Sequence, residues 1–384
     1  MRPAAFSLLL VLAPACGRVG YDALADRDAG DDPIDAPIDA EVGVLATCGA
    51  PVLVKDFGAA AGPGFHGLEV GASATGFVVA WSAGDDTIRT TGIAVHPGPR
   101  LELIQTAHDL VAKEDAVMSM SGIGDALMLG IDDPGGPGTW LFALDASGYE
   151  RSETKYIDDY RSPGHDFVVA DAGRDRFVVM ATDGGGLKAF TRDHDIHPVD
   201  GPLTLLVRGS EGAAVTRLGA GYVAITGDSS QCDVLALDGA LVPVGSPSTV
   251  VMACHHPSVV AAPGGGVVAA WNCDNDAVWV TGGDPAALPG ERAVFGDATD
   301  PAENPRLAAV GAGVWYAYQV AGGRLGHAFL DGSGATVSGG EPTIVVESPA
   351  LRAYDLAVHG DDAFLFWLDA ASFTKLWAMK LCPP

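Results

Sequence analysis

Seven polar residues recur along the sequence at intervals of 45 to 51 residues, and their side chains are of types that bind ions and polar ligands. They are His66, Asp115, Asp166, Glu211, His256, Glu303 and Arg352. Two imidazoles and four carboxylates could hold a divalent cation or a cationic ligand, and Arg352 could bind an anionic group. If a metal binds, His66 and His256 are the expected ligands. The simpler interpretation is that these are solvated loop positions, which are polar without binding anything.

A hydrophobic run follows each of these residues at a fixed distance. Ten residues after each one, a turn leads into a run at 76–81, 125–128, 176–180, 221–225, 266–271, 313–318 or 362–367. Each run belongs to a repeated unit, in which an apolar strand precedes it (258–262), a third strand follows (325–330) and a short fourth strand comes last (343–346). The many glycines and prolines, Gly 51 and Pro 25, favour such short strands and tight turns over long helices.

Four strands in each repeat of this length are typical of one blade of a β-propeller. We therefore predict an all-β fold in which residues 48–384 form a seven-bladed β-propeller. The second strands are continuously apolar because each is sandwiched between neighbouring blades. Aromatic residues five positions after the start of a run are expected to pack between blades, namely Trp81, Trp271, Tyr318 and Trp367.

This architecture would bring the seven polar residues together. Each would open the innermost strand of its blade, so that the set surrounds one mouth of the central channel, a common place for ligands. His165, His255, Asn304 and Asp355 stand near members of the set in the sequence.

The two ends of the predicted propeller contain the elements that could close it. The last unit lacks a fourth strand, and residues 52–56 form a spare strand before the first unit. We predict that this N-terminal strand completes the last blade and removes its exposed edge. Cys48 precedes the closing strand and Cys382 follows the strand with which it would pair, so a disulfide is expected to join them.

Three further cysteines lie within the units. Cys254 and Cys273 flank the hairpin of the fifth unit and lie nearly opposite each other, so a second disulfide between them is expected. Export favours such bridges over a zinc site. Cys232 remains, and it could pair with Cys254 instead.

The first 15 residues have the pattern of a secretory signal peptide. One positive charge precedes an apolar stretch at 4–13, and small residues precede Cys16. The run 12–16 resembles a bacterial lipobox, which implies that Cys16 is acylated; ordinary signal cleavage is the alternative. By the same resemblance, Gly17 in place of Asp implies the outer membrane, on its periplasmic or cell-surface side.

Acidic residues dominate both the segment after the signal and the predicted propeller. Residues 16–47 are rich in Asp, Ala, Pro and Gly, and we expect a disordered acidic tether. The chain has a net charge of −27; residues 17–47 contribute −6 and Arg2 contributes +1, which leaves about −22 for the propeller. This charge argues against a nucleic-acid partner, and it limits membrane contact to the lipid anchor.

The pattern Gly-x-Val-Val-Ala-Trp at 76–81 resembles the exported propeller repeats of delta-proteobacterial and myxobacterial lipoproteins. The segment Cys-Gly-Arg-Val-Gly-Tyr-Asp-Ala-Leu at 16–24 and the Asp-Ala-Pro tether are similar to that group as well. The resemblance covers nearly the whole chain and implies the fold and export only. No active-site residues follow from it, and the pairs typical of WD repeats and the sialidase Asp box are absent.

No linear motif of a hydrolase occurs in the sequence, neither Gly-x-Ser-x-Gly nor His-Glu-x-x-His. We therefore expect a monomeric, exported, lipid-anchored binding or scaffold module for a protein or a glycan, without a cofactor apart from the candidate cation. The competing hypothesis is a hydrolase or lyase of extracellular polymers that uses the channel mouth. An enzyme would require convergent acid-base groups in a pocket, whereas a binding module requires an exposed patch.

Overall fold

A computed structural model describes most of the chain after the predicted tether. The described residues are 44–58, 67–82, 87–98, 100–104, 107–112, 117–132, 138–152, 155–158, 167–183, 186–206, 212–227, 230–252, 254–273, 277–288, 293–296, 302–311, 313–320, 324–346, 349–369 and 375–384. They belong to one compact unit, Ile38–Pro384. The predicted signal peptide and Cys16 lie outside them. Within the described part, no helix has the length and apolar character needed to cross a membrane.

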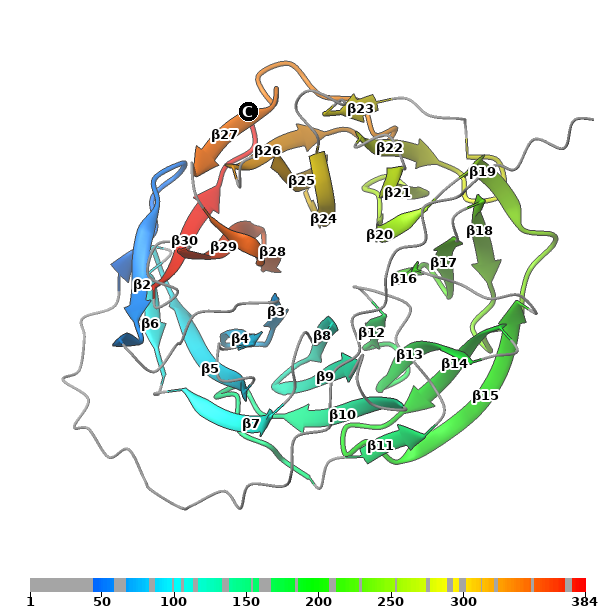
Figure 1. The fold of residues 1–384 in the computed structure, drawn as a ribbon, viewed down its shortest axis with the longest axis horizontal. Helices are drawn as coiled ribbons and strands as arrows, with labels where there is room; N and C mark the ends of the chain where they lie inside the picture. The colour runs from blue at the N-terminus through cyan, green and yellow to red at the C-terminus, as the bar shows by residue number, and fades with distance from the viewer. Residues whose placement is uncertain are drawn as a thin grey trace, which may run out of the picture. The chain divides into compact units, whose positions relative to one another are not determined.

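The strands form seven antiparallel sheets arranged around a common axis, which confirms the predicted seven-bladed propeller (Figure 1). The first blade contains β3 (Leu68–Ala72), β4 (Gly76–Ser82), β5 (Thr87–His96), β6 (Arg100–Leu103) and β7 (His108–Ala112). The second contains β8 (Val117–Ile123), β9 (Ala126–Asp132), β10 (Gly138–Leu144) and β11 (Lys155–Asp158). The third contains β12 (Val168–Asp171), β13 (Arg176–Asp183), β14 (Gly186–Arg192) and β15 (Pro198–Leu206).

The later blades repeat this order from the centre outward. The fourth contains β16 (Gly212–Leu218), β17 (Gly221–Gly227), β18 (Gln231–Leu237) and β19 (Ser248–Met252). The fifth contains β20 (His255–Ala261), β21 (Val267–Cys273), β22 (Ala277–Gly283) and β23 (Ala293–Phe295). The sixth contains β24 (Ala302–Val310), β25 (Gly313–Val320), β26 (Arg324–Leu330) and β27 (Thr343–Val346). The seventh contains β28 (Pro349–His359), β29 (Asp362–Asp369), β30 (Lys375–Leu381) and β2 (Val52–Asp56).

The ring closes as the sequence predicts. Strand β2 pairs antiparallel with β30, so the N-terminal strand forms the outer edge of the seventh blade (Figure 1). A disulfide joins Cys48 to Cys382 across a sequence separation of 334 residues. The amide of Gly49 also donates a hydrogen bond to the carbonyl of Lys380 at 3.0 Å. The two ends of the propeller are therefore held by a strand pair and a covalent bond at the same place.

An additional strand begins the fold before the predicted boundary at Cys48. Strand β1 (Val44–Leu45) pairs with β6 at the outer edge of the first blade, and Ala46 is buried. The N-terminal segment therefore contacts the first and the seventh blades, on both sides of the closure.

The second strand of every blade is almost entirely buried, as expected for a strand that packs against both neighbours. The predicted aromatic positions fulfil this role: Trp81, Trp271, Tyr318 and Trp367 each belong to a hydrophobic cluster built from two adjacent blades. Glycine begins several second strands because the third strand passes very close. A Cβ on Gly76 would lie 2.0 Å from the carbonyl oxygen of Ile93, and one on Gly221 would lie 2.2 Å from that of Leu237.

Aspartate forms the turn after the third strand in the second to sixth blades. These turns begin at Asp145, Asp193, Asp238, Asp284 and Asp331, and each aspartate accepts a hydrogen bond from the backbone amide two residues later. In four of them, the same carboxylate oxygen also accepts from the amide four residues later. The side chain thus replaces a backbone acceptor and fixes the loop, which explains the aspartate at the start of these turns.

The predicted second disulfide is not tested by the structure, because the side chain of Cys273 lies outside the described part. Register places Cys254 and Cys273 beside the cross-strand pair His255–Asn272, which agrees with the prediction that they lie opposite each other. Cys254 also shares a hydrophobic cluster with Cys232, but Cys232 is free, so the alternative bridge between these two is not formed in the structure. The pairing of Cys254 with Cys273 stays a prediction.

Candidate functional site at the start of the innermost strands

The predicted ring of polar residues is described only in part. His66, Asp115, Asp166 and Glu211 lie outside the described residues, and of Arg352 only the backbone on β28 is described. His256 on β20 and Glu303 on β24 are described, and both side chains are partly buried. The adjacent fifth and sixth blades are therefore the part of the predicted mouth that can be examined.

The innermost strands of these two blades begin with the same backbone irregularity. Pairing with the second strand shifts register between His255 and Ser258 in β20 and between Glu303 and Arg306 in β24. Each bulge contains a residue before proline with positive φ, 48° at His256 and 53° at Asn304. The α conformation is disfavoured before proline, and positive φ is rare for residues other than glycine.

The equivalent of His256 in the sixth blade is therefore Asn304, and Glu303 is equivalent to His255. The predicted set consists of the residues ten positions before each hydrophobic run. This spacing selects positions that differ by one between the two blades, because the hairpin from Ser258 to Ala270 is one residue longer than the hairpin from Arg306 to Ala317. The side chain that opens β24 at the position of His256 is thus Asn304, and the predicted Glu303 stands one residue before it.

Neighbouring blades hold the backbone of Asn304 from both sides. Its amide donates to Oδ1 of Asn272, on β21 of the fifth blade, at 3.1 Å. Its carbonyl accepts a short hydrogen bond from the hydroxyl of Tyr354, on β28 of the seventh blade, which also lies 3.3 Å from the carbonyl of Glu303. Burial raises the pKa of Tyr354, so the hydroxyl remains a donor. These contacts explain how an unfavourable conformation persists at this position.

The side-chain amide of Asn304 is buried without a partner among the described residues. The residue is 3% exposed, and neither Nδ2 nor Oδ1 makes a hydrogen bond. A buried polar group without a hydrogen bond costs about 1–3 kcal/mol, and positive φ adds to that cost. Both amide atoms are covered from solvent, so a hydroxyl or amide group of a ligand would reach this unused donor and acceptor only by displacing a neighbouring side chain.

Charged side chains on three consecutive innermost strands bind one another. Glu69, Arg306 and Asp355 occupy equivalent positions of the first, sixth and seventh blades. Nη2 of Arg306 lies 2.8 Å from Oε1 of Glu69, and its Nε lies 3.9 Å from Oδ1 of Asp355. Asp355 in turn accepts hydrogen bonds from the amides of Val70 and Leu356, both at 2.7 Å. These three charged groups therefore bind one another and hold the sixth, seventh and first blades together, so we assign them a structural role.

The predicted metal site is not assembled from residues in the described ranges. No group of three or more histidines, cysteines, aspartates or glutamates there could hold a metal ion. His256 is partly buried and His66 lies outside these ranges, so a metal at this pair stays a prediction.

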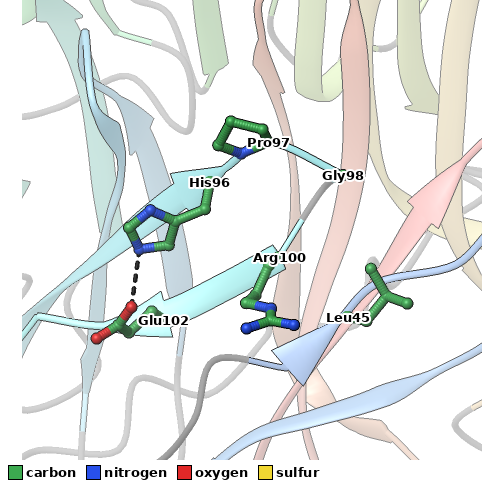
Figure 2. Close-up of a pocket in the computed structure, with 6 residues that line it drawn as sticks. All are labelled: Leu45, His96, Pro97, Gly98, Arg100 and Glu102. Carbon is green, nitrogen blue, oxygen red and sulfur yellow. Dashed lines mark ion pairs between the residues drawn. The ribbon is translucent and has the colours of Figure 1, made fainter.

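A shallow groove of about 440 Å³ lies far from the axis, at the outer strands of the first blade. Figure 2 shows its lining residues, which come from β1 and the β5–β6 hairpin. His96 and Glu102 face each other, with Nε2 and Oε2 2.8 Å apart, and both side chains are about half exposed. Arg100 lies between this pair and Leu45 (Figure 2). Exposed ion pairs of this kind contribute little, and the groove brings no further reactive group to the pair.

Comparison of the sequence with known proteins yields no match to a protein-family model and no match to a curated protein. Solved structures do match over most of the chain. The β-propeller domain of Cps50 (Swd1) from Myceliophteria thermophila is 13% identical with a TM-score of 0.55, covering 87% of this chain and 100% of that domain.

Two further structures are similar to the same degree. BBS1N, solved in complex with ARL6DN, is 13% identical with a TM-score of 0.55, covering 89% of this chain and 98% of its own. Hydrazine synthase from Kuenenia stuttgartiensis is 12% identical with a TM-score of 0.54, covering 84% and 96%. At such identities the likeness concerns the fold alone. The chain is thus a seven-bladed β-propeller.

Proposed function

We propose that the protein is an exported, lipid-anchored binding module that recognises a protein or a glycan at the mouth of its channel. The observation that carries this proposal is Asn304, whose buried amide has no partner among the described residues although its backbone is fixed by Asn272 and Tyr354. Strained and unsatisfied residues that neighbours hold in place are characteristic of ligand sites.

The chemistry of an amide defines the ligand that this position accepts. One side chain offers a donor and an acceptor without charge, which suits sugar hydroxyls and peptide groups. The residues of the predicted ring would add charged contacts: Glu303 from the same blade as Asn304, and His66, Asp115, Asp166, Glu211, His256 and Arg352 from the other six blades. BBS1N was solved with a protein bound, which is compatible with the use of this fold for recognition.

Binding to glycan and peptide arrays tests the proposal, with Asn304→Gly as the key variant. Glycine accepts positive φ without strain and removes the amide, so the fold is kept while the ligand contact is lost. Asp175→Gly is a matched control for glycan binding, because Asp175 also has positive φ, 54°, and its side chain is 77% exposed in the turn between β12 and β13, where it pairs with His194. We expect binding by the wild-type protein and by Asp175→Gly, and binding weakened about tenfold or more in Asn304→Gly.

Two results would contradict the proposal. Equal binding by Asn304→Gly and the wild-type protein would remove the site from the channel mouth. Failure of the wild-type protein to bind any glycan or peptide would remove the binding function itself.

Lipid anchoring at Cys16, and with it the outer membrane, is a separate part of the proposal. It is supported by the lipobox-like run at 12–16 and by the acidic segment that would separate the anchor from the propeller. Labelled fatty acid should be incorporated into the wild-type protein in a bacterial host and be absent from Cys16→Ser. Labelling that survives this substitution would contradict acylation at Cys16.

A further inference from the structure

One buried carboxylate between the third and fourth blades is surrounded by three arginines. Asp171, at the end of β12, is 0% exposed. Its carboxylate lies 3.1 Å from Nε of Arg217, 3.5 Å from Nη1 of Arg174 and 3.8 Å from Nε of Arg176. The hydroxyl of Tyr222 donates a short hydrogen bond to the same carboxylate. A single negative charge therefore organises three guanidinium groups from two blades.

The cluster carries a surplus of positive charge on an acidic chain. The only other carboxylate that these contacts include is Asp200, which lies 3.3 Å from Nη1 of Arg176 and is largely exposed. Counting only the groups in contact, three guanidinium groups face two carboxylates, which leaves +1 in a protein with a net charge of −27. Asp175, between Arg174 and Arg176 in the sequence, pairs with His194 at 2.9 Å instead of with these arginines.

Two of the three arginines have donors available to a ligand. Arg174 and Arg217 are each 38% exposed, whereas Arg176 is 11% exposed and donates to the carbonyl of Gly239 at 2.9 Å. Arg217 contacts Asp171 through Nε, and its terminal nitrogens have no acceptor within the described part of the chain. The contacts of Arg174 to Asp171 and to the carbonyl of Ala220, 3.5 and 3.3 Å, are long. Terminal guanidinium nitrogens in this state bind carboxylates well.

Exposed aliphatic residues stand next to the cluster in sequence. Arg176 donates hydrogen bonds to the carboxylate of Asp200 and to the carbonyl of Gly239. In the sequence, Val199 directly precedes Asp200, and Val242 and Val244 follow shortly after Gly239. Their exposed fractions are 48%, 52% and 60%, among the highest of the large hydrophobic side chains. Exposed aliphatic residues in the two segments that Arg176 contacts suit a protein interface, where arginine is enriched. Glycan sites generally offer aromatic rings, and none of these three residues is aromatic.

We propose that Arg174 and Arg217 bind an acidic side chain of a protein partner, with Val199, Val242 and Val244 covered by apolar residues beside it. This site is distinct from the channel mouth and goes beyond the function proposed there. Asp171, Arg176 and Tyr222 act as the support that holds the two arginines in place.

Selection from an immobilised library of short random peptides tests this site. We expect the selected peptides to contain Asp or Glu next to Val, Leu or Ile. Arg174→Gln together with Arg217→Gln should weaken their binding about tenfold or more, as expected for loss of charge-assisted hydrogen bonds. Arg100→Gln removes the same charge from the groove of the first blade and should leave binding unchanged.

Two additional variants keep the test decisive if Arg217 is needed for folding. Arg174→Gln alone leaves Asp171 with Arg176, Arg217 and Tyr222, and Val242→Ser with Val244→Ser changes only exposed side chains. Each should weaken peptide binding at an unchanged melting temperature. Peptides without acidic residues, equal binding by folded variants, or preference for an acidic polysaccharide would overturn the proposal. Asn304→Gly should bind these peptides normally, so failure here is distinguishable from failure of the channel-mouth site.

Discussion

Arg306 of the sixth blade and Glu69 of the first blade form a buried ion pair, although the seventh blade stands between these two blades in the ring. The atoms Nη2 and Oε1 are 2.8 Å apart, and each side chain is only 4% exposed although 237 residues separate the two positions. Asp355 of the intervening blade adds a second carboxylate to the same arginine. The ring is thus closed at its outer edge by β2 and the disulfide, and these ion pairs join the sixth, seventh and first blades at its centre.

Breaking this pair should be strongly destabilising. Arg306→Met removes the arginine from both Glu69 and Asp355, and Glu69→Gln leaves Arg306 the longer contact to Asp355. About 3–5 kcal/mol is a typical loss when a buried ion pair is broken. The double variant removes both charges and should lose less than the sum of the single losses, as measured by urea unfolding. Additive losses would show that the two residues do not act as a pair.

The Cys48–Cys382 disulfide should contribute stability because it closes a long loop, with a sequence separation of 334 residues. On the loop-entropy model, loss of the bridge in Cys48→Ser with Cys382→Ser costs about 6 kcal/mol. The melting temperature of this variant should fall to that of the reduced wild-type protein. A further fall when the variant itself is reduced would indicate a second bridge, which we expect peptide mapping to assign to Cys254 with Cys273.

Asn304→Gly should be at least as stable as the wild-type protein. The substitution removes a buried amide without a partner and places glycine at a positive φ, and the two effects together favour the folded state by about 1–3 kcal/mol. Chemical unfolding measures this gain. A clear loss of stability would mean that the amide has a structural role, and binding data on this variant would then need Asn304→Asp as a substitute.

Partly buried His327 should make stability depend on pH. Desolvation lowers the pKa of this histidine to about 4, from a usual value near 6.5. Between these values the unfolded chain binds more protons than the folded protein, so stability rises with pH. Above about pH 6.5 this histidine takes no stability from the folded protein, and stability falls as the pH is lowered toward 4. Unfolding of His327→Gln between these limits should show a weaker pH dependence than that of the wild-type protein; equal slopes would contradict this role.

A divalent cation at the predicted histidines should be visible as a thermal shift. If His66 and His256 ligate a metal, calcium or zinc should raise the melting temperature of dialysed protein, and His66→Ala with His256→Ala should abolish the rise. The absence of a shift with any cation would eliminate the metal hypothesis.

The seven blades could be predicted from the sequence because each blade is marked by a local pattern that repeats along the chain. Continuous apolar runs at regular intervals identify the second strands, and the aromatic residue five positions later, as in Trp81 or Trp367, reports packing between two blades. Strand β1 was not predicted because two aliphatic residues in an acidic segment have no periodicity to recognise.

The candidate site was harder to predict because it depends on backbone irregularities and on long-range partners. Only the His256-Pro257 and Asn304-Pro305 pairs, at equivalent places in adjacent units, could have indicated the paired bulges. The arginines around Asp171 come from a turn, a strand and the next blade, so no spacing in the sequence marks them as neighbours.

The pairing of β2 with β30 has a consequence for the order of folding. Each blade from the first to the sixth can form from contiguous chain, but the seventh needs the strand at 52–56 and the strand at 375–381 together. The segment synthesised first must therefore wait, unpaired, until the last segment is available. Contacts so distant in sequence form slowly, and during that delay the hydrophobic sides of the first and seventh blades are open to capture by chaperones or to aggregation.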